Sequence, residues 1–279
     1  MLEFSNAVFA GGGSRCFWQA GFWSVFDADG TRTPQRVVGV SAGAAMACLT
    51  FSGRVQFGLD DFKQRAADNR RNFYPGRVVG RGEVFPHERI YRDAILATVD
   101  ADALARLHAG PHLQIAMAGM PRWAGTQTGA LAGLLAYNIE KRVRKPMHPV
   151  LGRAIGFRSI LGTTRACATP EALADLILAS SSTPPVTPVG MFEGEHVLDG
   201  GIVDNVPVHA LEDEPGETLV LLSRRYPELP SVAQRTYLQP SMPIPVSMWD
   251  YTNPQALQDT FDLGRRDAET YLATARQAS

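Results

Sequence analysis

The sequence predicts an α/β fold in which helices cover both faces of a mostly parallel central sheet, a three-layer α/β/α sandwich. Two observations predict it. Apolar residues make up 45% of the 279 residues, which is enough to build a large core. In the first fifty residues, short apolar strand-like segments alternate with helical segments, and this alternation is typical of parallel strands joined by helices. We expect one domain spanning residues 1–279.

The individual elements follow from local patterns. Phe17, Phe22 and Phe26 recur at helical spacing, and Thr169 followed by Pro170 is a good helix start. Strands are predicted over residues 6–9, 36–40, 113–117, 165–168, 195–198 and 218–222. Helices are predicted over 17–26, 42–50, 60–69, 88–98, 130–141, 170–180 and 254–276, with a loop over 70–86. We interpret the segment of about 119–150 as an insertion or lid on the same domain.

Charge and cysteine content exclude several classes of protein. The formal charge of −1 gives no support for a nucleic-acid partner. The odd set of Cys16, Cys48 and Cys167 contains no C-x-x-C pair, which argues against disulfides and zinc and favours a reducing compartment. His87-Glu88 begins like a zinc-protease motif, but Tyr91 stands where the second histidine should be. With no secretory signal and no long apolar run, we expect a cytoplasmic protein. Since none of these cysteine and histidine patterns completes a metal site, we expect no metal, and we expect no cofactor.

The segment Gly39-Val40-Ser41-Ala42-Gly43 matches the pattern G-x-S-x-G and lies between an apolar strand and a helix. A sharp strand-to-helix turn exposes the serine hydroxyl, and flanking glycines avoid clashes between the neighbouring strand and helix. The helix N-terminus favours developing negative charge. A chance match to a short pattern is the alternative. The context favours Ser41 as a nucleophile, with Gly39 and Gly43 forming its elbow.

Three consecutive glycines, Gly11, Gly12 and Gly13, directly follow the first strand. Unshielded amides in such a loop bind an anion or an oxyanion. A dinucleotide-binding turn would need a third glycine where Cys16 stands and an acidic end to the second strand, and a phosphate-binding Walker loop would need G-K-[ST]. A tight turn that serves packing alone is a further alternative.

The segment Asp199-Gly200-Gly201 follows a short strand, so the turn projects the aspartate side chain. Taken by itself, this pattern is more often an ordinary Asp-Gly turn.

Together, these three motifs resemble the patatin-like phospholipase family, which pairs a G-G-G-x-[RK]-G loop with a G-x-S-x-G elbow and a downstream D-G-G or D-G-A. The segments 179–185 and 205–208 are also similar to family segments. The resemblance implies a Ser41–Asp199 dyad that hydrolyses acyl esters of lipids through an acyl-enzyme, without a cofactor. It also implies an oxyanion hole at Gly11, Gly12 and Gly13, with Arg15 bracing this loop or adding positive potential. The chain departs from the family pattern at Cys16, where glycine is usual.

Other interpretations stay open at this point. A Ser-His-Asp triad is formally allowed because His209 follows Asp199, although only two strands precede Ser41. The basic run 141–145 indicates either contact with a membrane surface or a solvated helix end. The same dyad would also serve an acyltransferase or thioesterase acting on carrier- or coenzyme-bound acyl groups. A non-catalytic scaffold or nucleotide-binding module is the alternative from another class, and nothing in the sequence indicates an oligomeric state.

Overall fold

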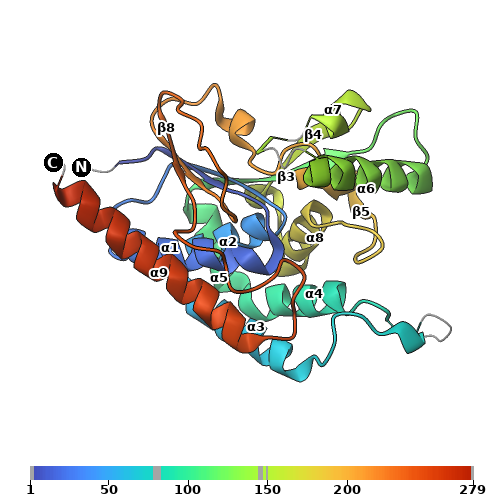
Figure 1. Cartoon of the computed structure of the whole chain (residues 1–279), viewed down its shortest axis with the longest axis horizontal. Coiled ribbons are helices and arrows are strands. Elements are labelled where there is room, and N and C mark those ends of the chain that lie inside the picture. Colours follow the sequence, from blue (N-terminus) through green and yellow to red (C-terminus); the bar gives the residue numbers. More distant parts are fainter. Residues whose placement is uncertain (1–2, 78–82, 144–146, 149, 278–279) are drawn as a thin grey trace.

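The computed structural model describes residues 3–77, 83–143, 147–148 and 150–277, and within them eight strands form one sheet (Figure 1). The strands follow the spatial order β5-β6-β3-β2-β1-β7-β8, and β4 also pairs with β3. Their bounds are β1 Asn6–Phe9, β2 Arg36–Val40, β3 His112–Gly119, β4 Arg158–Thr163, β5 Gly190–Phe192, β6 Glu195–Asp199, β7 Thr218–Leu221 and β8 Arg235–Leu238.

The sheet is mixed but mostly parallel. Pairs β1–β2, β2–β3, β1–β7 and β7–β8 are parallel, whereas β4 and β6 run antiparallel to β3, and β5 runs antiparallel to β6. Because strands β1, β2 and β3 are covered on both faces, they are apolar and buried almost throughout. The predicted three-layer α/β/α fold with a mostly parallel sheet is confirmed.

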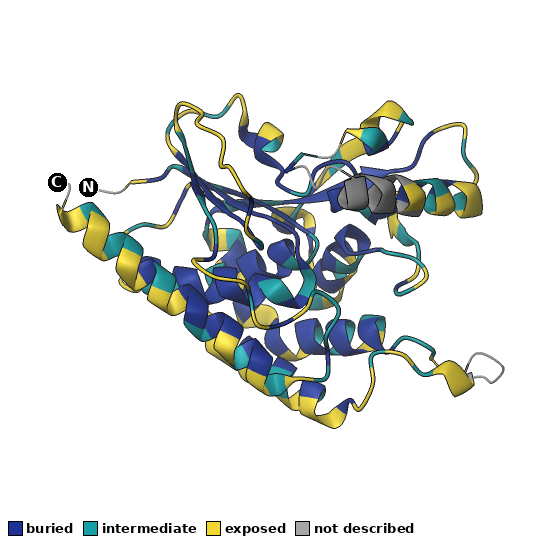
Figure 2. Cartoon of the chain, in the orientation of Figure 1, coloured by how far each residue is buried: buried dark blue, intermediate teal, exposed yellow. Residues whose placement is uncertain are grey.

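Most of the helices pack on one face of the sheet, and α6 and α7 lie on the other (Figure 1). The main core joins side chains of β1, β2, β3 and β7 to α1, α2 and α8 on that first face, with α9 lying along α1. Buried residues gather along the sheet and the helix surfaces that face it, while the outer side of α9 is exposed (Figure 2). The helices are α1 Phe17–Phe26, α2 Ala42–Phe51, α3 Val55–Asp68, α4 His87–Thr98, α5 Ala101–Ala109, α6 Thr126–Val143, α7 Leu151–Ala154, α8 Pro170–Ser180 and α9 Pro254–Gln277.

The second face of the sheet has smaller cores of its own. Val8, Val38 and Val220 project from it and pack against Val206 and Leu211 of the segment that follows β6. Nearer to α6 and α7, a further cluster contains Leu198 and Phe157. The alternation of apolar side chains between the two faces is what holds the sheet between two layers.

One predicted strand is wrong. Residues 165–168 are not a strand: Thr164–Ala166 form a short 3-10 helix, and the Cys167 N–H donates to the Thr164 carbonyl. The strand lies earlier, at β4, where it pairs antiparallel with β3. Thr163 caps the turn by accepting from the Arg165 N–H, and this side-chain bond competes with extended backbone.

The segment predicted as a lid contains α6, whose Ala130 reaches the pocket described below. A lid role for it stays a prediction. The side chains of the basic run 141–145 and the part of the predicted loop at 78–82 lie outside the described residues. Among the helices that are described, none has the length and apolar character needed to cross a membrane.

Candidate active site

Ser41 sits at a sharp turn between β2 and α2, with a backbone φ of 54° and ψ of −135°. A positive φ is costly for a residue with a Cβ atom, and such strain is maintained only where the surroundings enforce it. A Cβ on Gly39 would lie 2.6 Å from the Cα of Ala44, and a Cβ on Gly43 would lie 2.5 Å from the carbonyl oxygens of Phe9 and Ala10. Glycine is therefore required at both positions for the chain to make this turn.

Strand pairing brings Asp199 beside this turn. Val40, the last residue of β2, pairs with Ala116 of β3, and the next residue of β3, Met117, pairs with Asp199 at the end of β6. Ser41 and Asp199 thus flank β3 at the same level. Adjacent strands are about 4.8 Å apart, so two strand spacings can be bridged by a serine and an aspartate side chain. Both residues line the same pocket.

The Asp199 carboxyl is enclosed by protein. This burial raises the pKa of Asp199 to about 6. The nearby donor groups of Ser41, Gly201 and Thr183 act in the opposite direction and lower it in part. The Gly201 N–H donates to Oδ1 at 2.8 Å, and the Asp199 N–H donates to the Ser182 carbonyl at 2.8 Å. The carboxyl is therefore fixed in orientation and is a stronger base than an exposed aspartate.

The glycine-rich loop runs past the same pocket. Gly12 and Gly13 line it, and within the described chain their N–H groups make no hydrogen bond. The Gly11 N–H donates instead to the Asn205 carbonyl at 3.0 Å, and the Asn205 side chain returns a bond to the Gly11 carbonyl. The expectation that Gly11 donates to an oxyanion is corrected accordingly, because its amide is already used to fix the loop.

Arg15 and Cys16 follow this loop and are not among the described residues that line the pocket. The Arg15 Nε donates to the Gly12 carbonyl at 3.2 Å, which closes the loop on itself. Cys16 is buried, its thiol lies 3.4 Å from the Ala10 carbonyl, and burial raises its pKa to about 12. Cys16, which stands where the family usually has glycine, therefore places its side chain in the core, where a small neutral thiol fits.

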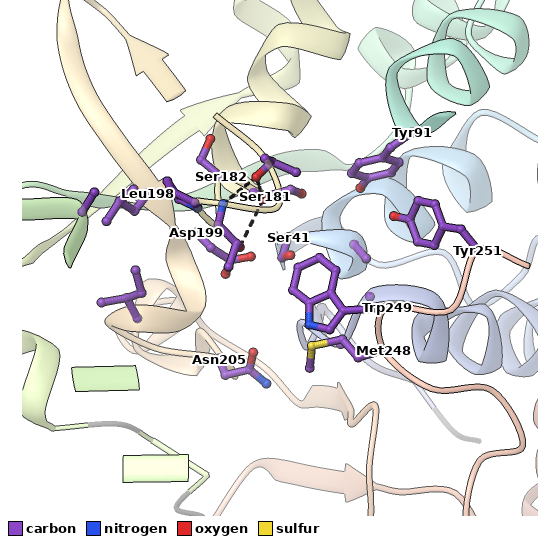
Figure 3. Close-up of a pocket in the computed structure, with 18 residues that line it drawn as sticks. Ser41, Tyr91, Ser181, Ser182, Leu198, Asp199, Asn205, Met248, Trp249 and Tyr251 are labelled. Atoms are coloured by element: carbon purple, nitrogen blue, oxygen red, sulfur yellow. Dashed lines mark hydrogen bonds between the residues drawn. The ribbon is translucent and has the colours of Figure 1, made fainter. Parts of the chain in front are cut away.

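The pocket lies between the ends of β2 and β6, the glycine-rich loop and the segment before α9 (Figure 3). Its further lining includes Tyr91, Asn205, Met248, Trp249 and Tyr251. No histidine is among the described lining residues, and His209 lies in the layer on the second face of the sheet. The described pocket therefore offers no imidazole for a Ser-His-Asp triad.

A second, largely apolar cavity lies beside this pocket. The two share Gly13, Ala42, Tyr91 and Tyr251, so each opens beside the other. The second cavity is enclosed mainly by α2, α3 and α4, and its lining is mostly apolar, including Ala45, Leu49, Phe62, Ala94 and Ile95. Such a space suits a flexible apolar chain whose polar end lies at Ser41.

Ser180 supports the turn at Ser41. It is fully buried at the end of α8, its Oγ accepts from the Ser41 N–H at 2.7 Å, and it donates to the Ala116 carbonyl at 2.7 Å. One hydroxyl therefore ties α8, β3 and the strained residue together. The sequence pattern singled out the segment 179–185 but assigned no role to Ser180. The segment 205–208 was likewise noted without a role for Asn205, and Trp249 and Tyr251 left no signal of their own in the sequence, because packing of distant loops brings them to the pocket.

A three-layer α/β/α fold with a serine at a strained strand-to-helix turn, facing a pocket, is an arrangement found in esterases and lipases. The model of the patatin-like phospholipase family matches residues 7–212, and the chain belongs to this family. Among solved structures, VipD from Legionella pneumophila is similar at a TM-score of 0.48 and 12% identity, over 98% of this chain and 67% of that one. No match was found among curated protein sequences.

We predict that Ser180→Ala lowers kcat by roughly 10- to 100-fold with little change in KM, because small misplacement of a reacting group costs rate. The substitution also leaves a buried N–H and a buried carbonyl unpaired, which costs about 1–3 kcal/mol of stability. Steady-state kinetics on folded protein measures the first effect. The control is Ser52→Ala, which removes another fully buried hydroxyl, at the far end of α2. Equal losses of kcat in the two variants would contradict the prediction and would show that Ser180 only stabilises the fold.

Proposed function

We propose that this chain is a serine hydrolase that cleaves acyl esters of lipids, with Ser41 as nucleophile and Asp199 as its base. Membership of the patatin-like phospholipase family supports lipid acyl hydrolysis in general. The observation that carries the finer proposal is the strand register that sets Ser41, held at a strained turn, and the buried Asp199 on either side of β3, so that both line one pocket.

In the first half of the reaction, the Ser41 Oγ attacks the ester carbonyl carbon while its proton moves to Asp199. The carbonyl oxygen becomes an oxyanion, and the N–H groups of Gly12 and Gly13 are the donors we assign to it. The positive end of α2 adds to this stabilisation. When the tetrahedral intermediate collapses, the ester C–O bond breaks, the acyl group stays on Ser41, and the leaving alkoxide takes the proton from Asp199.

In the second half, a water molecule attacks the acyl-enzyme while Asp199 accepts one of its protons. Collapse of this second intermediate releases the fatty acid and returns the proton to the Ser41 oxygen. Asp199 therefore serves as base twice and as acid twice, which suits a carboxyl with a pKa near 6 better than one near 4. Arg15 contributes by closing the glycine-rich loop rather than by touching the substrate.

The apolar cavity favours a lipid over a small polar ester. An acyl chain that enters it from Ser41 passes Ala42 and Tyr91 and ends among the side chains of α2, α3 and α4. Burial of each methylene group contributes about 0.8 kcal/mol, so the depth of the cavity sets the preferred chain length.

We predict that a fluorophosphonate probe labels the parent protein at Ser41. Ser41→Ala should show no labelling, and Asp199→Asn should label at least about a thousandfold more slowly, because the hydroxyl loses its proton acceptor. Gel fluorescence and mass spectrometry of the labelled peptide measure this. Asp175→Asn, which removes an exposed carboxylate on α8, is the matched control and should label like the parent. Similar labelling of all four proteins would overturn the proposal.

We predict that Ala94→Leu, which fills part of the apolar cavity, shifts the preferred acyl chain to shorter esters. The longest good substrate should lose about tenfold or more in kcat/KM, while the shortest esters keep theirs. A series of p-nitrophenyl esters from two to sixteen carbons measures the profile. Ala97→Leu places the same side chain on the exposed side of the same helix and should leave the profile unchanged. An unchanged profile in Ala94→Leu would show that acyl chains bind elsewhere.

A further inference from the structure

Three potential metal ligands meet on the second face of the sheet, outside the pocket. They are His148, Asp204 and His209, and one ligand atom from each lies within 4.8 Å of the others. Asp204 belongs to the segment that follows β6, and His209 to the short 3-10 helix Val208–Leu211. The sequence pattern does not group these residues as ligands, since 56 positions separate His148 from Asp204. The fold alone brings them together.

Asp204 is the unusual member, because its side chain is only 5% exposed. Its Oδ1 accepts from the Val206 N–H at 3.0 Å and lies 2.9 Å from the His148 Nδ1. Its Oδ2 is buried and accepts no hydrogen bond from any described residue, and the guanidinium of Arg153 lies 3.6 Å away. A buried carboxylate oxygen without a hydrogen bond is costly, and a directly bound cation would remove that cost.

The second histidine is oriented as a metal ligand usually is. The His209 Nδ1 lies 3.2 Å from the Glu212 Oε2, so an Nδ1–H that donates to this carboxylate leaves the Nε2 lone pair available. Histidine ligands in proteins commonly donate their other ring N–H to a carboxylate or carbonyl in this way. The rings of His148 and His209 have centroids 5.4 Å apart, which places both beside Asp204.

We propose that His148, Asp204 and His209 bind a divalent transition-metal ion of the zinc, cobalt or nickel type. Two imidazoles and one carboxylate suit these ions, whereas calcium and magnesium prefer oxygen ligands throughout. Ligands of tetrahedral zinc lie ~3.4 Å apart at bond lengths of ~2.1 Å, so separations of up to 4.8 Å need a closure of up to about 1.4 Å. The half-exposed side chains of His148 and His209 have the freedom to make it.

The position of the cluster indicates what the ion does. Asp204 is followed directly by Asn205, which lines the active-site pocket and holds Gly11 through two hydrogen bonds. A metal bound at Asp204 would join the segment at His148 to the loop that carries Asn205, and so stabilise one wall of the pocket. No step of the proposed ester hydrolysis uses the ion. The proposal of metal binding and the proposal of hydrolysis can therefore be contradicted independently of each other.

The test uses the untagged full chain, freed of metal by dialysis against a chelator and then titrated with Zn²⁺ and with Co²⁺. We expect one ion per chain by calorimetry, visible Co²⁺ absorption bands typical of nitrogen and oxygen ligation, and a Tm that rises with Zn²⁺ concentration. His209→Ala, a change at a half-exposed side chain, should lower the affinity at least tenfold. His196→Ala, at an exposed histidine of β6, should leave the affinity unchanged.

Either of two results would overturn the proposal. One is a folded parent chain that binds neither ion at concentrations up to about a millimolar, in which case the cluster is an ordinary hydrogen-bonded His–Asp group. The other is binding of equal affinity in the parent, His148→Ala and His209→Ala, which would place the ion elsewhere. Circular dichroism of each variant establishes that it is folded before the titration is interpreted.

Discussion

The site depends on the register of one strand with its two neighbours. Because Val40 of β2 pairs with Ala116 and Asp199 of β6 pairs with Met117, the serine and the aspartate face each other across β3. A shift of one residue in either pairing would turn the side chains of that strand to the other face of the sheet. The buried apolar faces of β2 and β3 fix this register, so the packing of the core and the geometry of the candidate site have the same origin.

Around this register, the site combines features that are costly elsewhere in a protein. Ser41 has a strained backbone, and Asp199 is a carboxyl removed from water. Ser180 compensates for the first by tying the turn to β3, and the Gly201 N–H compensates in part for the second. The result is a serine hydroxyl and a carboxyl of raised pKa that line one pocket, beside the amides of Gly12 and Gly13, which make no hydrogen bond within the described chain.

The sequence predicted the structure best at positions where a residue type is compatible with only one local backbone conformation. The glycines around Ser41 predicted the turn because no other residue fits there, and helix α8 followed from Thr169 and Pro170. It failed for residues 165–168, where a threonine-capped turn replaced a strand, and for the short strand β8. It also missed helix α5, although Asp100 caps this helix and Ala103, Leu104 and Leu107 recur at helical spacing. The hydrogen bond of Gly11 to Asn205 and the cluster at Asp204 depend on contacts between distant segments, which no local pattern contains.

The most direct measurement of the central claim is the pH dependence of the rate constant for fluorophosphonate labelling of Ser41. Asp199 must be ionised to accept the proton, and burial raises its pKa to about 6, so the rate should rise with pH, reach half its maximum near pH 6 and level off above about pH 7. Below the midpoint it should fall about tenfold per pH unit. A rate that stays constant down to pH 5, or a midpoint that persists in Asp199→Asn, would contradict the assignment of Asp199 as the base.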